Sequence, residues 1–375
     1  MANNKKLRSA KSAKNDEFYT QYSDISNECN HYRQHFRGKT IYCNCDDPAW
    51  SNFWKYFHSN FASLGLKRLI STHYQPDTEP SYAMIYEGGD DFNMDAGKIN
   101  EIYGNTGDVN GKEVFYTAGD FRSDACIELL KESDIVVTNP PFSLFREYVA
   151  QLMEYDKKFI IIGNQNAVTY KEIFPLIKDN KIWYGASVHS GGIDFRMPDD
   201  YEEYSKNVFI KNGHHYINLA GIRWFTNMDV KYRHDGLWHK NGIFDNSQAH
   251  KYYEGNETKY PVYDNIDAIN VDKTSDIPID YPGVMGVPIT WLDKYNPEEF
   301  VILGCTANPE SNDVEKRPRS EKALRLIYEK RLIGAKCVGG NSNIFIDENN
   351  YVHVLYHRIL IKNRHPIKKS DDLGY

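Results

Sequence analysis

The fold is decided by a stretch in which an apolar run leads into two prolines, Asp134-Ile135-Val136-Val137-Thr138-Asn139-Pro140-Pro141-Phe142. The apolar run predicts a buried strand. The two prolines lack amide donors and fix the backbone where that strand ends. In sheets built from strands and helices, ligands bind beyond the carboxyl ends of the strands. We therefore expect the chemistry of this protein just after Thr138 and just after Cys45, where another expected strand ends.

The corner at Asn139–Phe142 predicts a site for a flat amino group. The Asn139 side-chain oxygen and the Pro140 carbonyl can accept the two hydrogens of one aromatic amine. This would favour a pyramidal nitrogen with a localised lone pair, an arrangement that helps most in the transition state. Phe142 would stack on the heterocycle and orient it. The alternative is an ordinary turn in which Asn139 only caps the next helix.

Short apolar runs alternate with helical patterns from Lys39 to Phe225, which predicts an α/β fold with a mostly parallel twisted sheet. The expected strands are 40–45, 67–71, 134–138, 158–163, 183–184 and 223–225. The expected helices are 49–64, 123–131 and one that carries Phe145, Tyr148, Val149 and Leu152.

The helix expected at 49–64 has its start and its end marked in the sequence. Asp47 is a suitable N-cap and Pro48 suits the first helical position, whereas Gly65 ends the helix. Its apolar face is expected to contain Trp50, Phe53, Trp54, Phe57 and Phe61.

Residues from about Met228 onward lose this alternation and become rich in Tyr, Asn, Asp, Gly and Pro. They predict a second, mixed α+β domain with short strands such as 300–303 and 352–355. A length of 375 residues agrees with two domains.

Charge is distributed unevenly along the chain. The net charge is -7, yet residues 1–14 hold five Lys or Arg and no acid, and residues 316–369 hold thirteen against four acids. A polyanionic partner would need only such local basic surfaces. The alternative is a solvated tail and a solvated helix face.

The sequence predicts a cytoplasmic protein without a membrane span. No run of eighteen apolar residues occurs, and the polar, basic N-terminus is unlike a signal peptide. Six cysteines in so long a chain do not form a typical disulfide framework. The group Cys29, His31, His35, Cys43 and Cys45 has no usual zinc spacing, so no metal site is expected.

Several motifs together resemble the EcoRI-like adenine-specific DNA methyltransferase family, over about Lys14 to Arg364. The stretch that ends in Asn139-Pro140-Pro141-Phe142 is similar to motif IV of amino-group methyltransferases. Further similar segments are Asn15–Thr20 (motif X), Cys43–Pro48 with Ser51–Phe57 (motif I), Gly119-Asp120-Phe121 (motif III), Gly283–Thr290 and Asp293–Pro297.

The resemblance implies a Rossmann-like methyltransferase fold that uses S-adenosylmethionine to methylate N6 of a flipped adenine in double-stranded DNA. It implies a basic arm and motif X segment at 1–35, a catalytic domain at 36–228 and a DNA target-recognition domain at 229–375. A companion restriction endonuclease without stable binding would fit such an enzyme. The oligomeric state and the recognition sequence are not specified.

The resemblance also assigns residues to roles. The catalytic residues would be Asn139, Pro140, Pro141 and Phe142. The cofactor would be bound by Phe18, Tyr19, Thr20, Asp46, Asp47, Pro48, Asp120 and Phe121. DNA phosphates would be contacted by Lys316, Arg317, Arg319, Arg325, Lys330 and Arg331.

The sequence departs from the usual pattern at two places. Asp46-Asp47-Pro48 stands where a glycine-rich cofactor loop is usual, and Ser71-Thr72-His73 lacks the acid expected to bind the ribose. Two other functions remain open. One is methylation of RNA adenine or a protein glutamine, and the other is non-catalytic DNA binding on a degenerate methyltransferase fold.

Overall fold

The computed structural model describes residues 19–74, 80–89, 97–188, 191–197, 208–240, 243–244, 250–339 and 342–368. The chain divides into two compact units. The first comprises the residues up to Asn164 together with Tyr184–Met228, and the second comprises Gln165–Trp183 and the residues from Asp229 onward. Phe18 and the basic arm lie outside the described residues. None of the described helices is long and apolar enough to cross a membrane.

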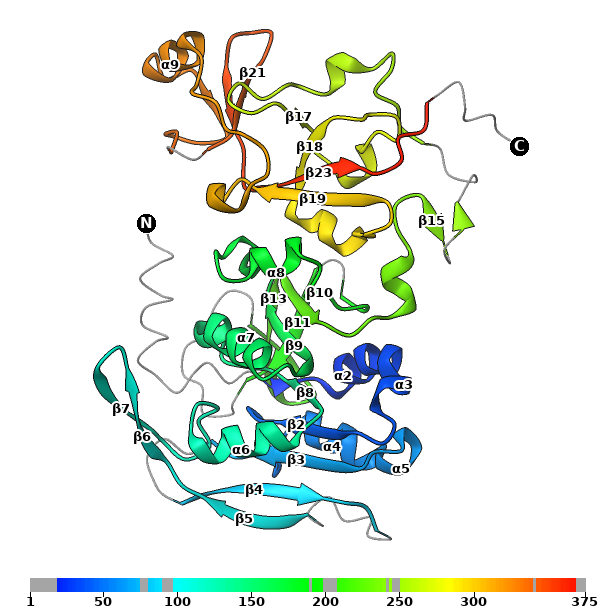
Figure 1. Ribbon diagram of the computed structural model, residues 1–375, viewed down its shortest axis with the longest axis vertical. Coiled ribbons are helices and arrows are strands. Elements are labelled where there is room, and N and C mark those ends of the chain that lie inside the picture. Colours follow the sequence, from blue (N-terminus) through cyan, green and yellow to red (C-terminus); the bar gives the residue numbers. More distant parts are fainter. Residues whose placement is uncertain are drawn as a thin grey trace. The chain divides into compact units, whose positions relative to one another are not determined.

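An eight-stranded sheet forms the centre of the first unit, among the residues described. Its strands lie in the order β10 (Trp183–Tyr184), β14 (Ile222–Thr226), β9 (Lys158–Asn164), β8 (Ile135–Thr138), β2 (Thr40–Cys43), β3 (Arg68–Thr72), β4 (Ser81–Tyr86) and β5 (Lys98–Ile102). Figure 1 shows the succession from β9 to β5.

The middle of this sheet is parallel and its flanks are antiparallel. Strands β9, β8, β2 and β3 pair in parallel, whereas β14 runs antiparallel to β9, and β4 and β5 continue antiparallel beyond β3. Strands β2 and β8 are buried along their whole length, as the apolar runs predict. The expected α/β architecture with a mostly parallel central sheet is therefore confirmed.

The described helices of the first unit are α2 (Tyr22–Cys29), α3 (Arg33–Phe36), α4 (Asn52–Ser59), α5 (Phe61–Leu64), α6 (Asp124–Glu132) and α7 (Phe145–Glu154). Ser123 caps α6, because its hydroxyl accepts from the Cys126 amide. The side chains of Phe145, Tyr148, Val149 and Leu152 form the buried face of α7, also as expected.

The start predicted for the helix after β2 was wrong. Helix α4 begins at Asn52, because the Ser51 hydroxyl accepts from the Phe53 amide and so caps it. Asp47 instead caps a turn by accepting from the Ala49 amide at 2.9 Å. Trp50 lies in that turn and is partly exposed, and Asn60 separates α4 from α5.

Two further strand groups of the first unit were not predicted. A hairpin of β6 (Asn105–Val109) and β7 (Lys112–Tyr116) projects beside the main sheet (Figure 1). A second sheet has the order β1 (Tyr19–Thr20), β11 (Gly192–Arg196), β13 (His214–Ala220) and β12 (Val208–Lys211). This second sheet incorporates the end of the motif X segment as an antiparallel strand.

The second unit is built around a four-stranded sheet in the order β17 (Ile269–Asn270), β18 (Val284–Pro288), β23 (Arg358–Asn363) and β19 (Phe300–Cys305). A three-stranded sheet of β20 (Leu332–Ile333), β22 (Val352–Val354) and β21 (Ile344–Ile346) packs with α9 (Glu321–Tyr328). Helix α8 (Phe174–Lys178) and the pair β15 (His239–Lys240) and β16 (Ile243–Phe244) complete the described elements.

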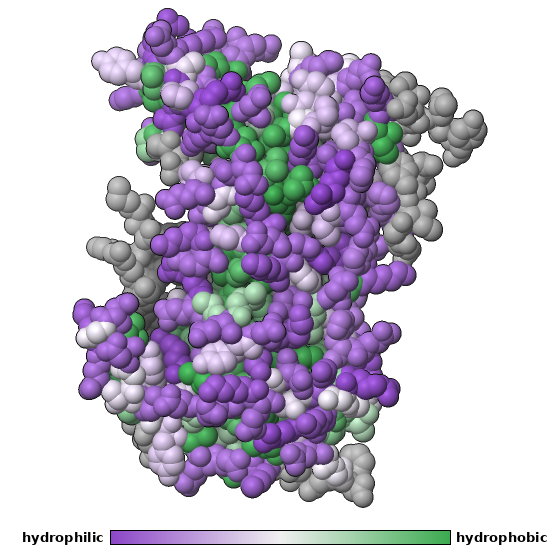
Figure 2. All heavy atoms as spheres, in the orientation of Figure 1, coloured by the Kyte–Doolittle hydropathy of each residue, from purple (hydrophilic) through white to green (hydrophobic). Residues whose placement is uncertain are grey.

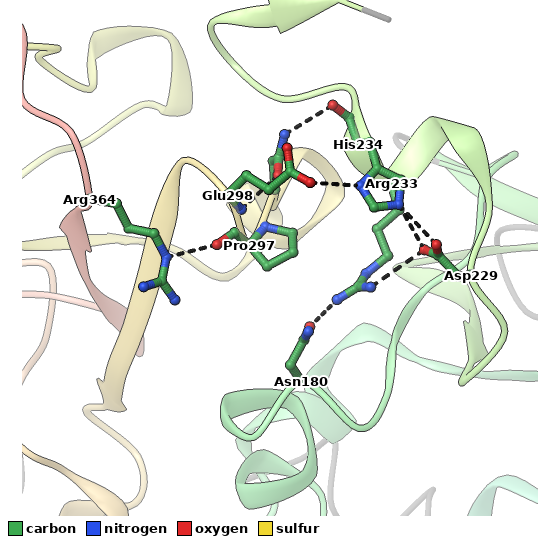
Figure 3. A network of polar contacts seen from close by, with 8 residues as sticks. Asn180, Asp229, Arg233, His234, Pro297, Glu298 and Arg364 are labelled. Atoms are coloured by element: carbon green, nitrogen blue, oxygen red, sulfur yellow. Dashed lines mark hydrogen bonds and ion pairs between the residues drawn. The ribbon is translucent and has the colours of Figure 1, made fainter. Parts of the chain in front are cut away.

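A polar network in the second unit surrounds His234 (Figure 3). Its ring nitrogens lie 2.9 Å from a carboxylate oxygen of Asp229 and 3.3 Å from one of Glu298. The Asn296 amide donates to the His234 carbonyl at 3.0 Å. The hydrogen bond with Asp229, reinforced by the charges of Asp229 and Glu298, raises the pKa of His234 although burial opposes it. The protonated ring is therefore favoured in the folded state.

We predict that replacing His234 by Gln removes a pH-dependent part of the stability. A raised histidine pKa stabilises the fold fully below about pH 6.5, and that contribution is lost as the pH rises through the folded-state value. The melting temperature of the wild type should therefore fall relative to that of His234→Gln between about pH 6 and about pH 8. Parallel pH profiles of the two proteins would contradict the assignment.

Candidate active site

The Asn139–Phe142 corner lies directly after β8, with η3 (Phe142–Leu144) leading into α7. Pro140 is buried, whereas Asn139, Pro141 and Phe142 are partly exposed. The Leu144 amide donates to the Pro141 carbonyl at 3.0 Å, which closes the turn. The corner is thus a closed turn in which the Asn139 side-chain oxygen is buried while other atoms of Asn139, Pro141 and Phe142 reach the surface.

The buried Asp46 carboxylate connects the ends of the central strands. One oxygen accepts from the Ser51 hydroxyl at 3.1 Å, and the other accepts from the Thr138 hydroxyl. The Asp46 carbonyl also accepts from the Ser71 hydroxyl of β3. Thr138 immediately precedes Asn139, so Asp46 holds the Asn139–Phe142 corner in register with the loop after β2.

Asp47 faces the end of β3 instead of a helix terminus. Its carboxylate lies 2.7 Å from the His73 ring nitrogen and accepts from the Tyr82 hydroxyl at 2.9 Å. The His73 and Tyr82 rings stack with centroids 5.1 Å apart. Burial opposes ionisation of Asp47, but the hydrogen bonds from His73 and from the Ala49 amide lower its pKa. The carboxylate is therefore ionised at neutral pH. Pro48 is buried beside it.

Contacts of Tyr148 link the end of β2 to α7 and to the predicted motif III. The Tyr148 hydroxyl donates to the Asn44 side-chain oxygen, and the Tyr148 ring meets the Phe121 ring edge-on at 5.0 Å. Burial raises the pKa of Tyr148 far above its usual value, so the hydroxyl stays a donor. The Asn44 side-chain nitrogen is buried and has no hydrogen-bond partner among the described residues.

Gly119 brings the motif III loop against the end of β3. Its φ is +82°, and a Cβ built there would lie 2.0 Å from the His73 carbonyl oxygen. The next residue, Asp120, accepts from the Arg122 side chain through both carboxylate oxygens, at 2.9 and 2.8 Å. The Arg122 guanidinium also lies over the Phe121 ring. Asp120 is thus neutralised by a neighbouring cation.

Thr20, at the end of the predicted motif X, reaches the same set of loops. Its carbonyl accepts from the Asn52 side chain at 2.7 Å, which ties β1 to the first turn of α4. The Thr20 hydroxyl is buried and lacks a hydrogen-bond partner within the described ranges. Tyr19 pairs with Arg196 through its backbone.

The structure therefore brings Thr20, Asp46, Asp47, Asp120 and Asn139 to the loops around the carboxyl ends of β2, β3 and β8. Sequence reasoning missed four partners that also lie there: Asn44, His73, Tyr82 and Tyr148. The sequence could have identified Tyr148, since a hydroxyl on the apolar face of a helix needs a buried acceptor. It could not have identified His73 and Tyr82, because their partner Asp47 is remote in sequence.

The six cationic residues predicted to contact DNA lie in the second unit on and around α9. Arg325 is on the helix and largely exposed, and Arg317 and Lys330 flank it and are exposed. Arg319 donates to the carbonyls of Gly339 and Ser342, and Arg331 donates to the Asn349 carbonyl. Lys316 is half-buried, and this burial, together with the charge of Arg319, lowers its pKa.

No group of three or more His, Cys, Asp or Glu side chains suited to a metal ion occurs among the residues that the structure describes. Cys29 and Cys43 are buried, with thiol pKa values raised by burial.

Comparison with known proteins identifies close relatives. The model of a family described as adenine-specific methyltransferase EcoRI matches residues 6–364. The chain is 48% identical to the type II methyltransferase M.EcoRI of Escherichia coli, over 88% of this chain and 98% of the relative. It is 41% identical to the type II methyltransferase M.MpnI of Mycoplasma pneumoniae, over 80% of this chain and 85% of the relative. No solved structure matches it.

We predict that Gly119→Ala disrupts the site far more than Gly111→Ala. Both glycines have a left-handed φ, of +82° and +78°, but a Cβ at Gly111 would meet nothing within 4 Å. Gly111→Ala should therefore cost only about 1 kcal/mol of stability. Gly119→Ala should cost about 2 kcal/mol more, because the His73 backbone must move. Chemical denaturation measures both values, and equal losses would show that the close approach is unimportant.

Proposed function

Because this chain belongs to the family of EcoRI adenine-specific methyltransferases, we propose that it transfers a methyl group to N6 of an adenine in duplex DNA through Asn139 and Pro140. The observation that carries this proposal is the partly exposed Asn-Pro-Pro-Phe corner at the end of β8. Membership in the family supplies the substrate base, and the corner supplies acceptors suited to its amino group.

In the proposed mechanism, the Asn139 side-chain oxygen and the Pro140 carbonyl accept the two N–H groups of the adenine amine. These acceptors would stabilise the positive charge that develops on nitrogen as its bond to the methyl carbon forms and the methyl–sulfur bond of the donor breaks to leave a neutral thioether, and they need no reorganisation at that moment. The nitrogen would then lose one of its hydrogens as a proton to water. Phe142 stacks on the base and restricts its rotation. The prolines fix this geometry, and Asp46 fixes its position through Thr138.

The described residues fit S-adenosylmethionine as the methyl donor. This molecule carries a cationic amine, a carboxylate, two ribose hydroxyls and an adenine ring, and it supplies a methyl group activated by a sulfonium. The buried Asn44 nitrogen and Thr20 hydroxyl, both without partners in the described part of the chain, are available polar atoms next to the strand ends. The ionised Asp47 carboxylate suits a ribose hydroxyl or the cationic amine.

Two residues predicted to bind the cofactor, Asp120 and Phe121, already have contacts within the protein. The Asp120 oxygens already accept from Arg122, but each carboxylate oxygen can accept a second hydrogen bond, so contact with an amino group is still compatible. Phe121 is buried against Tyr148, so it would present only an edge of its ring. Phe18 stays a prediction, because it lies outside the described residues.

We further propose that the second unit contains the surface that binds DNA. Residues 316–369 carry a strong excess of Lys and Arg, which favours binding to phosphates and makes it dependent on salt. The relatives are named type II methyltransferases, which supports a pairing with a restriction endonuclease that recognises the same site.

A transfer assay separates this function from the alternatives. Purified protein is incubated with labelled S-adenosylmethionine and, separately, with duplex DNA, RNA or a release-factor-type protein. We expect label on the N6 of DNA adenine. Label confined to RNA or protein would overturn the DNA assignment, and an absence of transfer with retained DNA binding would overturn catalysis.

We predict that Asn139→Ala lowers kcat by at least about 100-fold, because one of two acceptors for the developing charge is lost. The affinities of this variant for S-adenosylmethionine and for DNA should differ from those of the wild type by less than about threefold, which corresponds to less than about 1 kcal/mol. Asn100→Ala, on the antiparallel edge strand β5 of the same sheet, is the matched control. A kcat for Asn139→Ala close to that of the control would remove the mechanism.

A further inference from the structure

Helix α9 is an amphipathic helix with one face packed and one face open. Ala323 and Leu326 are buried in a cluster with Ile344 and Val352 of the three-stranded sheet. The helix start is fixed, since the Ser320 hydroxyl accepts from the Ala323 amide at 3.1 Å. The backbone and hydroxyl of Ser320 both donate to the Asp264 carboxylate. The helix is therefore held rigidly against the second unit.

The open face of α9 combines cations with exposed apolar side chains. Lys322, Arg325 and Tyr328 follow one another at intervals of three residues and so form one row along the helix. The side chain of Arg325 is 68% exposed and Tyr328 is 88% exposed. Leu324, 53% exposed, lies next to Tyr328 on the helix surface. Such exposure of a tyrosine and a leucine in a folded domain favours a binding surface.

The surroundings of this face are cationic and polar. Residues 316–336 contain eight Lys or Arg and only two acids, Glu321 and Glu329. Figure 2 shows that hydrophilic residues predominate on the surface around α9. Glu329 forms one long ion pair with the Arg325 Nε, at 3.9 Å, and the segment keeps an excess of six cations over acids. A polyanion complements this charge, whereas a neutral or basic protein partner does not.

The arginines near α9 differ in what they already bind. Arg319 and Arg331 donate to backbone carbonyls, and Arg331 also lies over the Tyr351 ring at 4.7 Å. These two side chains hold the loops on either side of the helix. Arg325, in contrast, lies in the middle of the helix with its side chain 68% exposed, and it forms an ion pair with Glu329, the C-cap of the same helix.

We propose that the row Lys322–Arg325–Tyr328 of α9 enters the major groove of DNA and reads base edges. An α-helix with its side chains is about 10–12 Å across, which fits a major groove of about 12 Å width. Arg can donate two hydrogen bonds to guanine, and the apolar atoms of Tyr328 and Leu324 suit the thymine methyl. Arg317 and Lys330, at the two ends of α9, would contact the phosphates on either side. This inference rests on the proposed function, because it assigns the specificity of that same DNA substrate.

The experiment begins with the recognition site of the full-length wild type. The protein methylates a pool of random-sequence duplexes with S-adenosylmethionine, and sequencing identifies the modified site. Single-turnover rates are then measured on this site and on duplexes with one changed base pair. The variants are Arg325→Gln, Tyr328→Ala and, as a phosphate contact, Lys330→Gln.

Matched controls come from the first unit. Lys131→Gln removes an exposed cation that, like Arg325, lies beside an acid on its own helix, α6. Tyr103→Ala removes a tyrosine that is 55% exposed. Both controls should keep the wild-type rate and specificity. The affinity of every variant for S-adenosylmethionine, measured in parallel, should equal that of the wild type.

We expect Arg325→Gln to lower the rate on the cognate site about 10- to 100-fold and to reduce discrimination against one changed base pair by a similar factor. Tyr328→Ala should act in the same direction. Lys330→Gln should weaken binding to all sequences alike. It should also reduce the slope of the logarithm of the binding constant against the logarithm of the salt concentration by about one.

Three results would overturn the inference, and they are distinguishable. Unchanged discrimination in Arg325→Gln and Tyr328→Ala, with an active wild type, removes the reading role of α9 alone. A change in sedimentation of these variants without a change in specificity shows that a second copy of the chain covers the face. A wild type that methylates no DNA removes the proposed function itself.

Discussion

The buried Asp46 carboxylate is the constraint on which the active site depends. Burial of a carboxyl group is costly unless its oxygens are hydrogen-bonded, and here hydroxyls from the N-cap of α4 and from β8 satisfy it. The same bonds fix the loop after β2 to Thr138, one residue before Asn139. Stability and the geometry of the proposed site are therefore coupled, because a change that frees Asp46 also releases the corner at Asn139. Loss of one hydrogen-bond partner from such a buried group typically costs about 1–3 kcal/mol.

The polar groups beyond β2, β3 and β8 are of two kinds. Asp46, Asp47 and Tyr148 make hydrogen bonds within the protein and define the shape of the loops. The Asn44 nitrogen and the Thr20 hydroxyl are buried without partners in the described ranges. Folded proteins leave few such atoms unsatisfied, and bound water or a ligand commonly completes them. The first group is thus the framework, and the second group supplies polar atoms that the proposed cofactor could use.

The sequence could predict the central strands and the catalytic corner because both depend on local signals. The apolar runs of β2, β8 and β9 and the prolines after Thr138 need no remote partner to be recognised. The start of α4 was misplaced because two residues, Asp47 and Ser51, were suitable caps, and only the distant His73 and Tyr82 decide between them. The strands β4 and β5 were not predicted, because their pairing depends on neighbouring strands and their own residues specify that pairing only weakly.

The acids near the corner raise the question of how an enzyme with a net charge of -7 accepts a polyanion. Two of the three aspartates beyond the central strands face cationic or ionisable partners: Asp47 pairs with His73, and Asp120 is bound by Arg122 through both oxygens. The third, Asp46, is buried and shielded by hydroxyl donors. The negative electrostatic potential that these three aspartates create at a substrate is therefore weaker than their number implies. Since about 0.1 M salt screens interactions between exposed charges beyond about 10 Å, acids farther than this from the cations around α9 have little effect on the DNA binding proposed there.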